Sequence, residues 1–140
     1  DMVDENCAYC MEGELVAKFG IKICELETSK VYLFKEQSHP GRCIVAHKKH
    51  VGDMNELTAE ERAAYFEDVA RVARAIMKAF NPDKVNYGAY GDTGHHLHFH
   101  LCPKYKDEYE WGGVFLMNPD KKYLTDEEYA AMIEKIKANL

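Results

Sequence analysis

The chain has 140 residues, of which 46% are hydrophobic and 30% are charged, and its formal net charge is −6. This length suits a single domain over residues 1–140 with a buried core. The negative charge argues against a protein that wraps nucleic acid or an anionic membrane, and no run of about 18 apolar residues predicts a membrane span.

The cysteines and the start of the chain bear on the cellular compartment. The chain has five cysteines. An odd count without an export signal favours reduced thiols, or thiolates on a metal, over a disulfide framework. The first five residues are mainly acidic, whereas an export signal begins basic and then becomes apolar. We therefore expect a cytoplasmic protein.

Three strands are predicted in the first third of the chain. Ile21–Leu26 and Lys30–Phe34 have strand character and are separated by a short turn. Arg42–Ala46 is a third strand, and its mainly apolar composition predicts burial. Pro40-Gly41 breaks the chain before it.

A long helix follows these strands. Thr58 and Glu61 have the spacing of a capping box, so we expect the helix to begin there. Asn81-Pro82 ends it. Residues at helical spacing predict a face that packs on the core: Tyr65, Phe66, Val69, Val72, Ala73, Ile76, Met77 and Phe80.

The second half of the chain completes the predicted sheet. Lys84–Tyr87 is a short strand, a loop covers Gly88–Gly94, and His96–Cys102 is the last strand. Thr125 and Glu128 form a second capping box, which opens a short C-terminal helix. We expect an α+β fold with a mainly antiparallel five-stranded sheet, one long central helix and a short C-terminal helix.

Three histidines alternate with apolar residues in the last predicted strand. Side chains on a strand point alternately to two faces, so His96, His98 and His100 share one face and the residues between them enter the core. Three imidazoles on one face of a strand are not explained by core packing alone. The spacing alone leaves open a reactive site, a metal site made by all three rings, or a chance surface cluster.

The run from His96 to Cys102 is similar to the signature of the histidine-triad (HIT) superfamily, His-φ-His-φ-His-φ-φ with φ apolar. The Pro103-Lys104-Tyr105 continuation, the Cys7-x-x-Cys10 pair and the segment 40–50 also resemble family segments, in the family's order. The resemblance therefore covers about residues 7–111. It implies a single HIT domain over residues 1–140, in a protein that is usually a homodimer.

The resemblance implies a hydrolase that cleaves a phosphoanhydride or phosphoramidate bond at the α-phosphate of a nucleoside conjugate. Its partner would be a purine nucleotide or a dinucleoside polyphosphate. His98 would be the nucleophile and form a nucleotidyl-histidine, which divides one hard step into two. His100 would donate to phosphate oxygens, Thr93 would assist the leaving group, and His96 completes the catalytic set.

Two alternatives to a hydrolase stay open at this point. A nucleotidyl transferase or phosphorylase would use the same intermediate on His98 but exclude water in favour of another acceptor. A nucleotide-binding protein with little turnover would keep the fold without the reaction. The sequence does not show which group attacks second.

Five further residues are expected around the nucleotide. Asn86 and Asp92 resemble family positions near the phosphate, Glu36 resembles the acidic residue at the ribose, and Tyr9 and Phe34 would line the base pocket. Tyr9 and Phe34 are equally consistent with plain core positions.

The chain departs from the family pattern at two positions near the expected site. Asp92 stands where glutamine or asparagine is common, and Arg42 stands where histidine is common. A carboxylate at the phosphate would repel it unless that carboxylate were protonated or paired, and Arg42 is one conceivable partner.

A Cys-x-x-Cys pair alone fits a redox pair, a metal pair or coincidence. The resemblance implies a structural zinc ion held by Cys7, Cys10, His50 and His96. Four protein ligands leave no position for water, so this zinc would not be catalytic. His47 and His95 are the alternatives if the register differs by a few residues.

Overall fold

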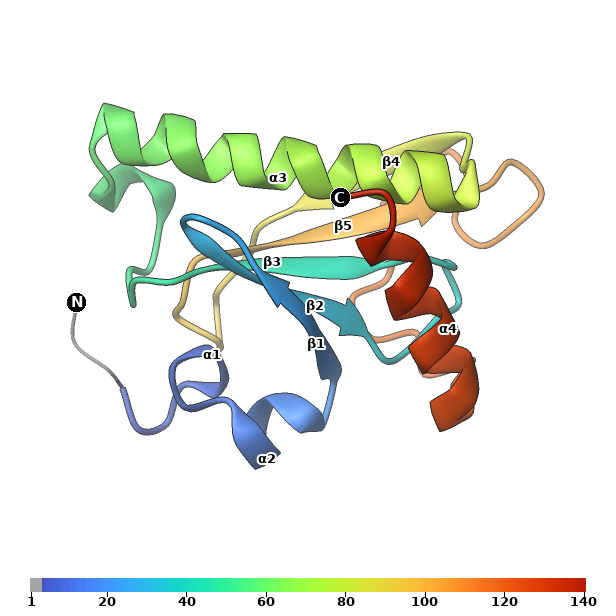
Figure 1. Ribbon diagram of the computed structural model, residues 1–140, viewed down its shortest axis with the longest axis horizontal. Helices are drawn as coiled ribbons and strands as arrows, with labels where there is room; N and C mark the ends of the chain where they lie inside the picture. The colour runs from blue at the N-terminus through green and yellow to red at the C-terminus, as the bar shows by residue number, and fades with distance from the viewer. Residues whose placement is uncertain (1–3) are drawn as a thin grey trace.

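A five-stranded antiparallel sheet forms the centre of the computed structural model, which describes residues 4–140 (Figure 1). Residues 1–3, part of the acidic start, lie outside the described residues. The strand order is β1-β2-β3-β5-β4, and every neighbouring pair is antiparallel. This is the predicted α+β architecture. The strands are β1 (Gly20–Glu25), β2 (Ser29–Phe34), β3 (Cys43–His47), β4 (Lys84–Gly88) and β5 (His98–Lys104).

The strand with the histidines begins two residues later than its spacing predicts. The prediction places His96 in the strand, whereas β5 begins at His98. The N–H of His96 donates to the carbonyl of Gly94 in a tight turn, and the N–H of Leu97 donates to Val51 in the loop after β3. These tertiary contacts end the regular ladder, and an alternating pattern of residue types does not encode them.

Two helices cover one face of the sheet. The helix α3 (Ala59–Phe80) lies along it, and α4 (Asp126–Lys137) packs against the same core (Figure 1). Both begin with the capping boxes predicted at Thr58 and Thr125. Most of the predicted inner face of α3 is buried, but Phe66 and Met77 lie at its edges and are 37% and 43% exposed. Within residues 4–140, no helix combines the length and the apolar character that crossing a bilayer requires.

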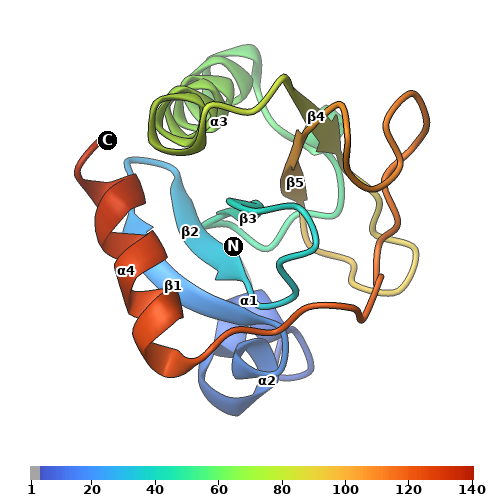
Figure 2. The same cartoon turned by 90° about the vertical axis from the view of Figure 1, so that its right-hand side faces the viewer.

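The opposite face is covered by the N-terminal segment, which forms α1 (Ala8–Met11) and α2 (Gly13–Ala17) (Figure 2). A single 3-10 turn, η1 (Met54–Glu56), precedes α3. Residue periodicity does not predict these three elements, because an element of about one turn is too short to show it.

The two faces of the sheet carry separate apolar cores. The apolar residues between the histidines, such as Phe99 and Leu101, join the core under α3 and α4, as their alternation predicts. In the sheet register His98 pairs with Ala46 and His100 pairs with Ile44. Both histidines therefore face the smaller core under α1 and α2, which consists of Tyr9, Val16, Tyr32, Phe34, Ile44 and Ala46.

The predicted break at Pro40-Gly41 fixes the start of β3. Gly41 has a φ of +96°, which favours glycine. A Cβ atom there would lie 2.6 Å from Cδ2 of Phe80, at the end of α3. The turn therefore brings the chain close against α3 immediately before Arg42, which is fully buried.

Asp68 fastens α3 to the turn between β1 and β2. Its Oδ2 accepts hydrogen bonds from the backbone N–H of Thr28 (2.9 Å), the hydroxyl of Thr28 (2.7 Å) and the hydroxyl of Ser29 (2.8 Å). Asp68 and Ser29 are both buried, so water cannot readily replace the carboxylate as acceptor.

We expect Asp68→Ala to lower the free energy of unfolding by about 2–4 kcal/mol, because buried donors lose their acceptor. Urea unfolding followed by circular dichroism measures this change. Glu67→Ala is the matched control, since Glu67 is the exposed neighbour on the same helix and should change stability by less than about 0.5 kcal/mol. An equal loss in both variants would assign the effect to helix charge instead.

Candidate active site and metal centre

A cavity of about 880 Å³ lies on the face of the sheet that carries His98 and His100. Its walls come from the N-terminal segment around Tyr9, the loop at residues 90–96 and the segment 114–118. The volume lies within the usual range of small-molecule sites. The cavity therefore joins the histidine strand to three segments that are far apart in the sequence.

His98 is a half-buried residue of this cavity. Its Nδ1 lies 2.7 Å from the backbone carbonyl of His96. A carbonyl oxygen only accepts, so Nδ1 carries the ring proton and donates it, which leaves a lone pair on Nε2. Burial lowers the pKa of His98 below its ordinary value and favours this neutral form. The ring of Tyr9 packs beside it with the ring centroids 4.8 Å apart.

His100 has the opposite protonation pattern. The Nη2 group of Arg42 donates a hydrogen bond to Nδ1 of His100 over 3.0 Å. A guanidinium offers only donors, so Nδ1 is the acceptor and the ring proton is on Nε2. Burial lowers the pKa of His100 to about 3, and the positive charge of Arg42 acts in the same direction. The ring is therefore a neutral donor at ordinary pH.

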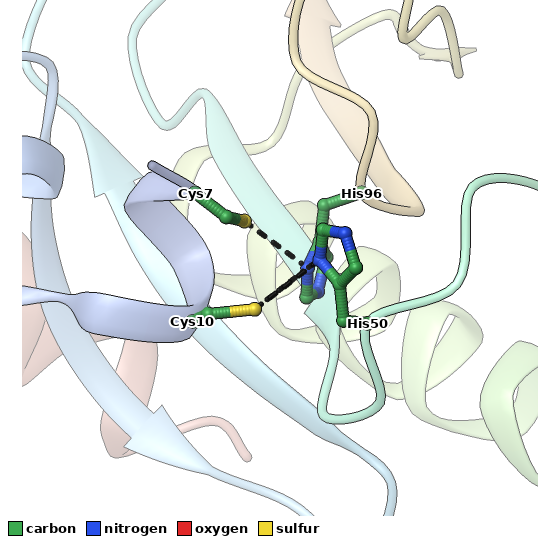
Figure 3. Close-up of side chains that lie close together, drawn as sticks. All are labelled: Cys7, Cys10, His50 and His96. Atoms are coloured by element: carbon green, nitrogen blue, oxygen red, sulfur yellow. Dashed lines mark hydrogen bonds between the residues drawn. The ribbon is translucent and has the colours of Figure 1, made fainter. Parts of the chain in front are cut away.

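His96 faces a different group of side chains. Its Nε2 donates to the backbone carbonyl of His47 at 2.6 Å, so its Nδ1 carries a lone pair. That Nδ1 lies 3.3 Å from Sγ of Cys7 and 3.0 Å from Nδ1 of His50. Figure 3 shows these side chains, together with Cys10, pointing toward one another.

The four side chains predicted as metal ligands form one cluster, in which the four ligand atoms all lie within 4.8 Å of one another. Cys7 and Cys10 come from the start of α1, His50 follows β3, and His96 precedes β5. Two thiols and two imidazole nitrogens are a common donor set of structural zinc sites. The lone pair on Nδ1 of His96 points into this cluster, which fits a cation held between the four ligand atoms.

The two alternative histidines lie outside this cluster. His47 accepts at Nδ1 from the backbone N–H of Lys49, over 2.9 Å, and packs on Tyr65 with ring centroids 5.1 Å apart. His95 lies against Gly52, where an added Cβ would collide with its ring. Each ring thus has a packing role of its own.

Four of the other residues expected at the nucleotide lie at the cavity. Thr93 and Asp92 are exposed residues of its lining. Tyr9 and Phe34 also line it while belonging to the smaller apolar core. No hydrogen bond between Asp92 and Arg42 is present among residues 4–140, and the guanidinium of Arg42 is directed to other partners.

Glu36 is placed differently from its expected position at the ribose, because it lies outside the cavity lining. Its Oε2 accepts from the backbone N–H groups of Lys121 and Lys122 at 2.8 and 2.7 Å, and Ser38 donates to both of its oxygens. The carboxylate therefore fastens the segment before α4. The spacing to Arg42 could not reveal this contact, since its partners lie about 85 residues away in the sequence.

Asn86 also lies outside the cavity lining. It pairs with Cys102 in the sheet register, whereas His100 pairs with Gly88. Asn86 therefore lies on the same face of the sheet as the histidines. It is next to Cys102, which is two residues beyond His100 and farther from His98.

Two features of the site are absent from the sequence predictions. Arg42 is expected there as a departure from the family pattern and a conceivable partner of Asp92, whereas in the structure it contacts His100. Residues Val114, Phe115, Met117 and Asn118 line the cavity, although the segment has no motif. The segment lies outside the helices and strands, so periodicity carries no signal for it.

Comparisons with known proteins agree with this geometry. A family model described as "HIT domain" matches residues 20–107. The protein named "Protein hit" of Bacillus subtilis is 29% identical over 123 residues, which cover 83% of each chain. The adenosine 5'-monophosphoramidase of Schizosaccharomyces pombe is 26% identical over 144 residues, which cover 96% of this chain and 98% of that enzyme.

Solved structures share the fold. A histidine triad protein from Sinorhizobium meliloti 1021 superimposes with a TM-score of 0.84 at 24% identity, covering 91% of this chain and 95% of that one. A Zn-bound histidine triad family protein from Mycobacterium smegmatis superimposes with a TM-score of 0.65 at 21% identity, covering 94% of each chain.

Proposed function

Because the chain belongs to the HIT domain family, we propose that it is a nucleotide hydrolase that acts through a nucleotidyl-histidine intermediate on His98. The bond cleaved is a phosphoramidate or phosphoanhydride at the α-phosphate of a nucleoside conjugate. The observation that carries the proposal is the hydrogen bond from Nδ1 of His98 to the carbonyl of His96. It leaves the lone pair of Nε2 free on a residue that lines the cavity.

The reaction has two displacements. In the first, Nε2 of His98 attacks the α-phosphorus, a P–N bond to the enzyme forms, and the bond to the leaving group breaks as that group takes a proton. In the second, water attacks the same phosphorus and loses a proton. The P–N bond to His98 breaks, which releases a nucleoside monophosphate and restores the lone pair. The carbonyl of His96 stabilises the positive charge that the ring carries in between.

The cavity supplies the remaining groups. Nε2–H of His100 is a neutral donor for the phosphate oxygens that gain charge in the transition state. Thr93 offers a hydroxyl to the leaving group, and Tyr9 and Phe34 offer aromatic surface to a base. This combination suits a purine nucleotide rather than a nucleic acid, because the cavity is small and the chain is acidic overall.

Asp92 favours a substrate with a single phosphate. Its carboxylate is an exposed part of the cavity lining, and it repels each further phosphate of a polyphosphate chain. The similarity to a monophosphoramidase over nearly the whole chain supports the same choice. We therefore infer that a nucleoside 5'-phosphoramidate is preferred over a dinucleoside polyphosphate.

We also infer that Cys7, Cys10, His50 and His96 hold a structural zinc ion. When bound, zinc would supply a cross-link and no reactive water, since its four positions are filled by protein. These ligands join α1 to the chain around β3 and β5. They would thereby hold Tyr9, which lies between the two cysteines, against the ring of His98.

We expect His98→Asn to reduce the hydrolysis of adenosine phosphoramidate by at least about three orders of magnitude, because the nucleophile is removed. The assay compares this substrate with diadenosine polyphosphates and guanosine counterparts. Glu67→Ala is the control, since Glu67 is exposed on α3 and lies outside the cavity lining. Equal activity of His98→Asn and the wild type would refute the nucleophile assignment.

Two further outcomes of this assay identify the alternatives. Hydrolysis of no substrate by the wild type would favour a binding protein. Formation of a nucleoside diphosphate on addition of inorganic phosphate would favour a phosphorylase, because phosphate rather than water then attacks the intermediate.

Asp92→Asn should shift the preference toward diadenosine triphosphate. Removing one exposed negative charge near the phosphates is worth about 1 kcal/mol, or about fivefold in the ratio of kcat/KM values. Competition between the two substrates in one reaction measures this ratio directly. An unchanged ratio would mean that the carboxylate lies too far from the distal phosphates to select against them.

Cys10→Ser should lower the zinc content from about one ion per chain to a small fraction of that, and lower the Tm by about 10 °C, because a metal-bound cross-link is lost. Metal analysis and thermal unfolding measure the two effects. Cys24→Ser is the control, as Cys24 is a half-buried thiol outside the cluster. A wild-type protein purified with zinc available but containing none would contradict the zinc assignment.

A further inference from the structure

Arg42 is a fully buried cation directly behind the cavity. Its Nη1 donates to the carbonyl of Leu116 and its Nη2 to the carbonyl of Met117, both over 3.1 Å. The same Nη2 donates to Nδ1 of His100 over 3.0 Å. The guanidinium carbon lies 4.1 Å from the ring centre of Phe34. Arg42 thus contacts both a strand histidine and the segment 114–118.

The positive charge of Arg42 is not paired with a carboxylate of the described residues. Within the described residues 4–140, no carboxylate lies within 4.0 Å of the guanidinium. Removing a cation from water without a paired anion is costly, and an apolar side chain often fits such a place with equal or greater stability. Stability alone therefore does not account for an arginine here.

The contact with His100 gives the arginine a specific effect. Neutral imidazole has two tautomers, and only the form with a lone pair on Nδ1 can accept from Arg42. The other tautomer would bring two N–H groups face to face, and a doubly protonated ring would add a second positive charge. The low pKa of His100, which burial and the charge of Arg42 both cause, agrees with this arrangement.

We propose that Arg42 is a positioning residue that locks His100 in the Nε2–H tautomer, so that this ring offers one fixed donor to the cavity. The identification of the acceptor as substrate phosphate rests on the proposed function. His98 and His100 then have opposite tautomers on one strand, the first with its lone pair on Nε2 and the second with its proton there. One ring can attack while the other stabilises the oxygens of the same phosphate.

Arg42 also holds the segment 114–118, which forms one wall of the cavity. Phe115 and Met117 line the cavity, and Arg42 holds the carbonyls of Leu116 and Met117. The guanidinium carbon lies 4.9 Å from the ring centre of Phe115. Arg42 therefore fixes the orientation of the His100 ring relative to residues 115–117. Removing the arginine should change both the ring and this segment.

The first test is a long-range ¹H–¹⁵N correlation spectrum of the histidine rings at neutral pH, on zinc-loaded protein. The signals of His100 are assigned by their loss in His100→Gln. In the wild type, we expect a protonated Nε2 and an unprotonated Nδ1. In Arg42→Met, the two nitrogen shifts should move toward each other as the second tautomer becomes populated. Arg42→Lys should keep the wild-type pattern, because an ammonium also only donates.

The second test is the hydrolysis of adenosine phosphoramidate by the same proteins. Arg42→Met should lower kcat by about 100-fold, comparable to the loss of one transition-state donor, with KM within about threefold. Arg42→Lys should recover at least about tenfold of this loss. Lys104→Met is the matched control. Lys104 is a buried cation that donates to the carbonyls of Glu110 and Gly113 without a contact to His100.

The ring spectra and the rates together decide the proposal. It is overturned by a wild-type His100 protonated on Nδ1, or by an Arg42→Met ring that keeps the wild-type pattern, whatever happens to kcat. A loss of kcat with that pattern intact, or an equal loss in Lys104→Met, would mean that Arg42 only stabilises the segment 114–118. If the wild type hydrolyses nothing, the proposed function fails, while the spectra still decide whether Arg42 sets the tautomer.

Discussion

The hydrogen bond from Nδ1 of His98 to the carbonyl of His96 is the contact on which the rest of the site depends. It fixes which nitrogen of His98 carries a proton, and therefore which nitrogen can react. The acceptor is available because the backbone at His96 lies outside the regular strand, where its N–H is used in a turn with Gly94. The late start of β5 is thus linked to the protonation pattern of His98.

Each histidine of the triad has a different partner and a different state. His96 donates to the carbonyl of His47 and aims its Nδ1 at the cysteines. His98 donates to the backbone and keeps Nε2 free, while His100 accepts from Arg42 and keeps Nε2 protonated. A carbonyl oxygen only accepts a hydrogen bond and a guanidinium only donates one, so each partner determines which ring nitrogen carries the proton. Three identical side chains on one segment thereby have three different hydrogen-bonding patterns.

The cavity is formed by the sheet and by the N-terminal segment, and these two parts are held in place by different packing. The sheet provides a rigid base, because the apolar side chains on the other face of β5 are packed under α3 and α4. The N-terminal segment has only two short helices and a small apolar core with the sheet. The Cys and His cluster joins this segment to the sheet. The cluster therefore lies where the cavity wall has only short helices and a small apolar core to support it.

Residue patterns predict the five strands to within a few residues, both capped helices and the alternation on β5, because these features depend on neighbours within a few residues. The family resemblance also predicts the four side chains that the structure brings together in one cluster. Three features become visible only in the folded chain: the contact of Arg42 with His100, the hydrogen bonds of Glu36 to residues 121 and 122, and the position of Asn86 outside the cavity lining. The first two of these features involve residues 58 to 86 positions apart, where periodicity carries no information and only packing brings the groups together.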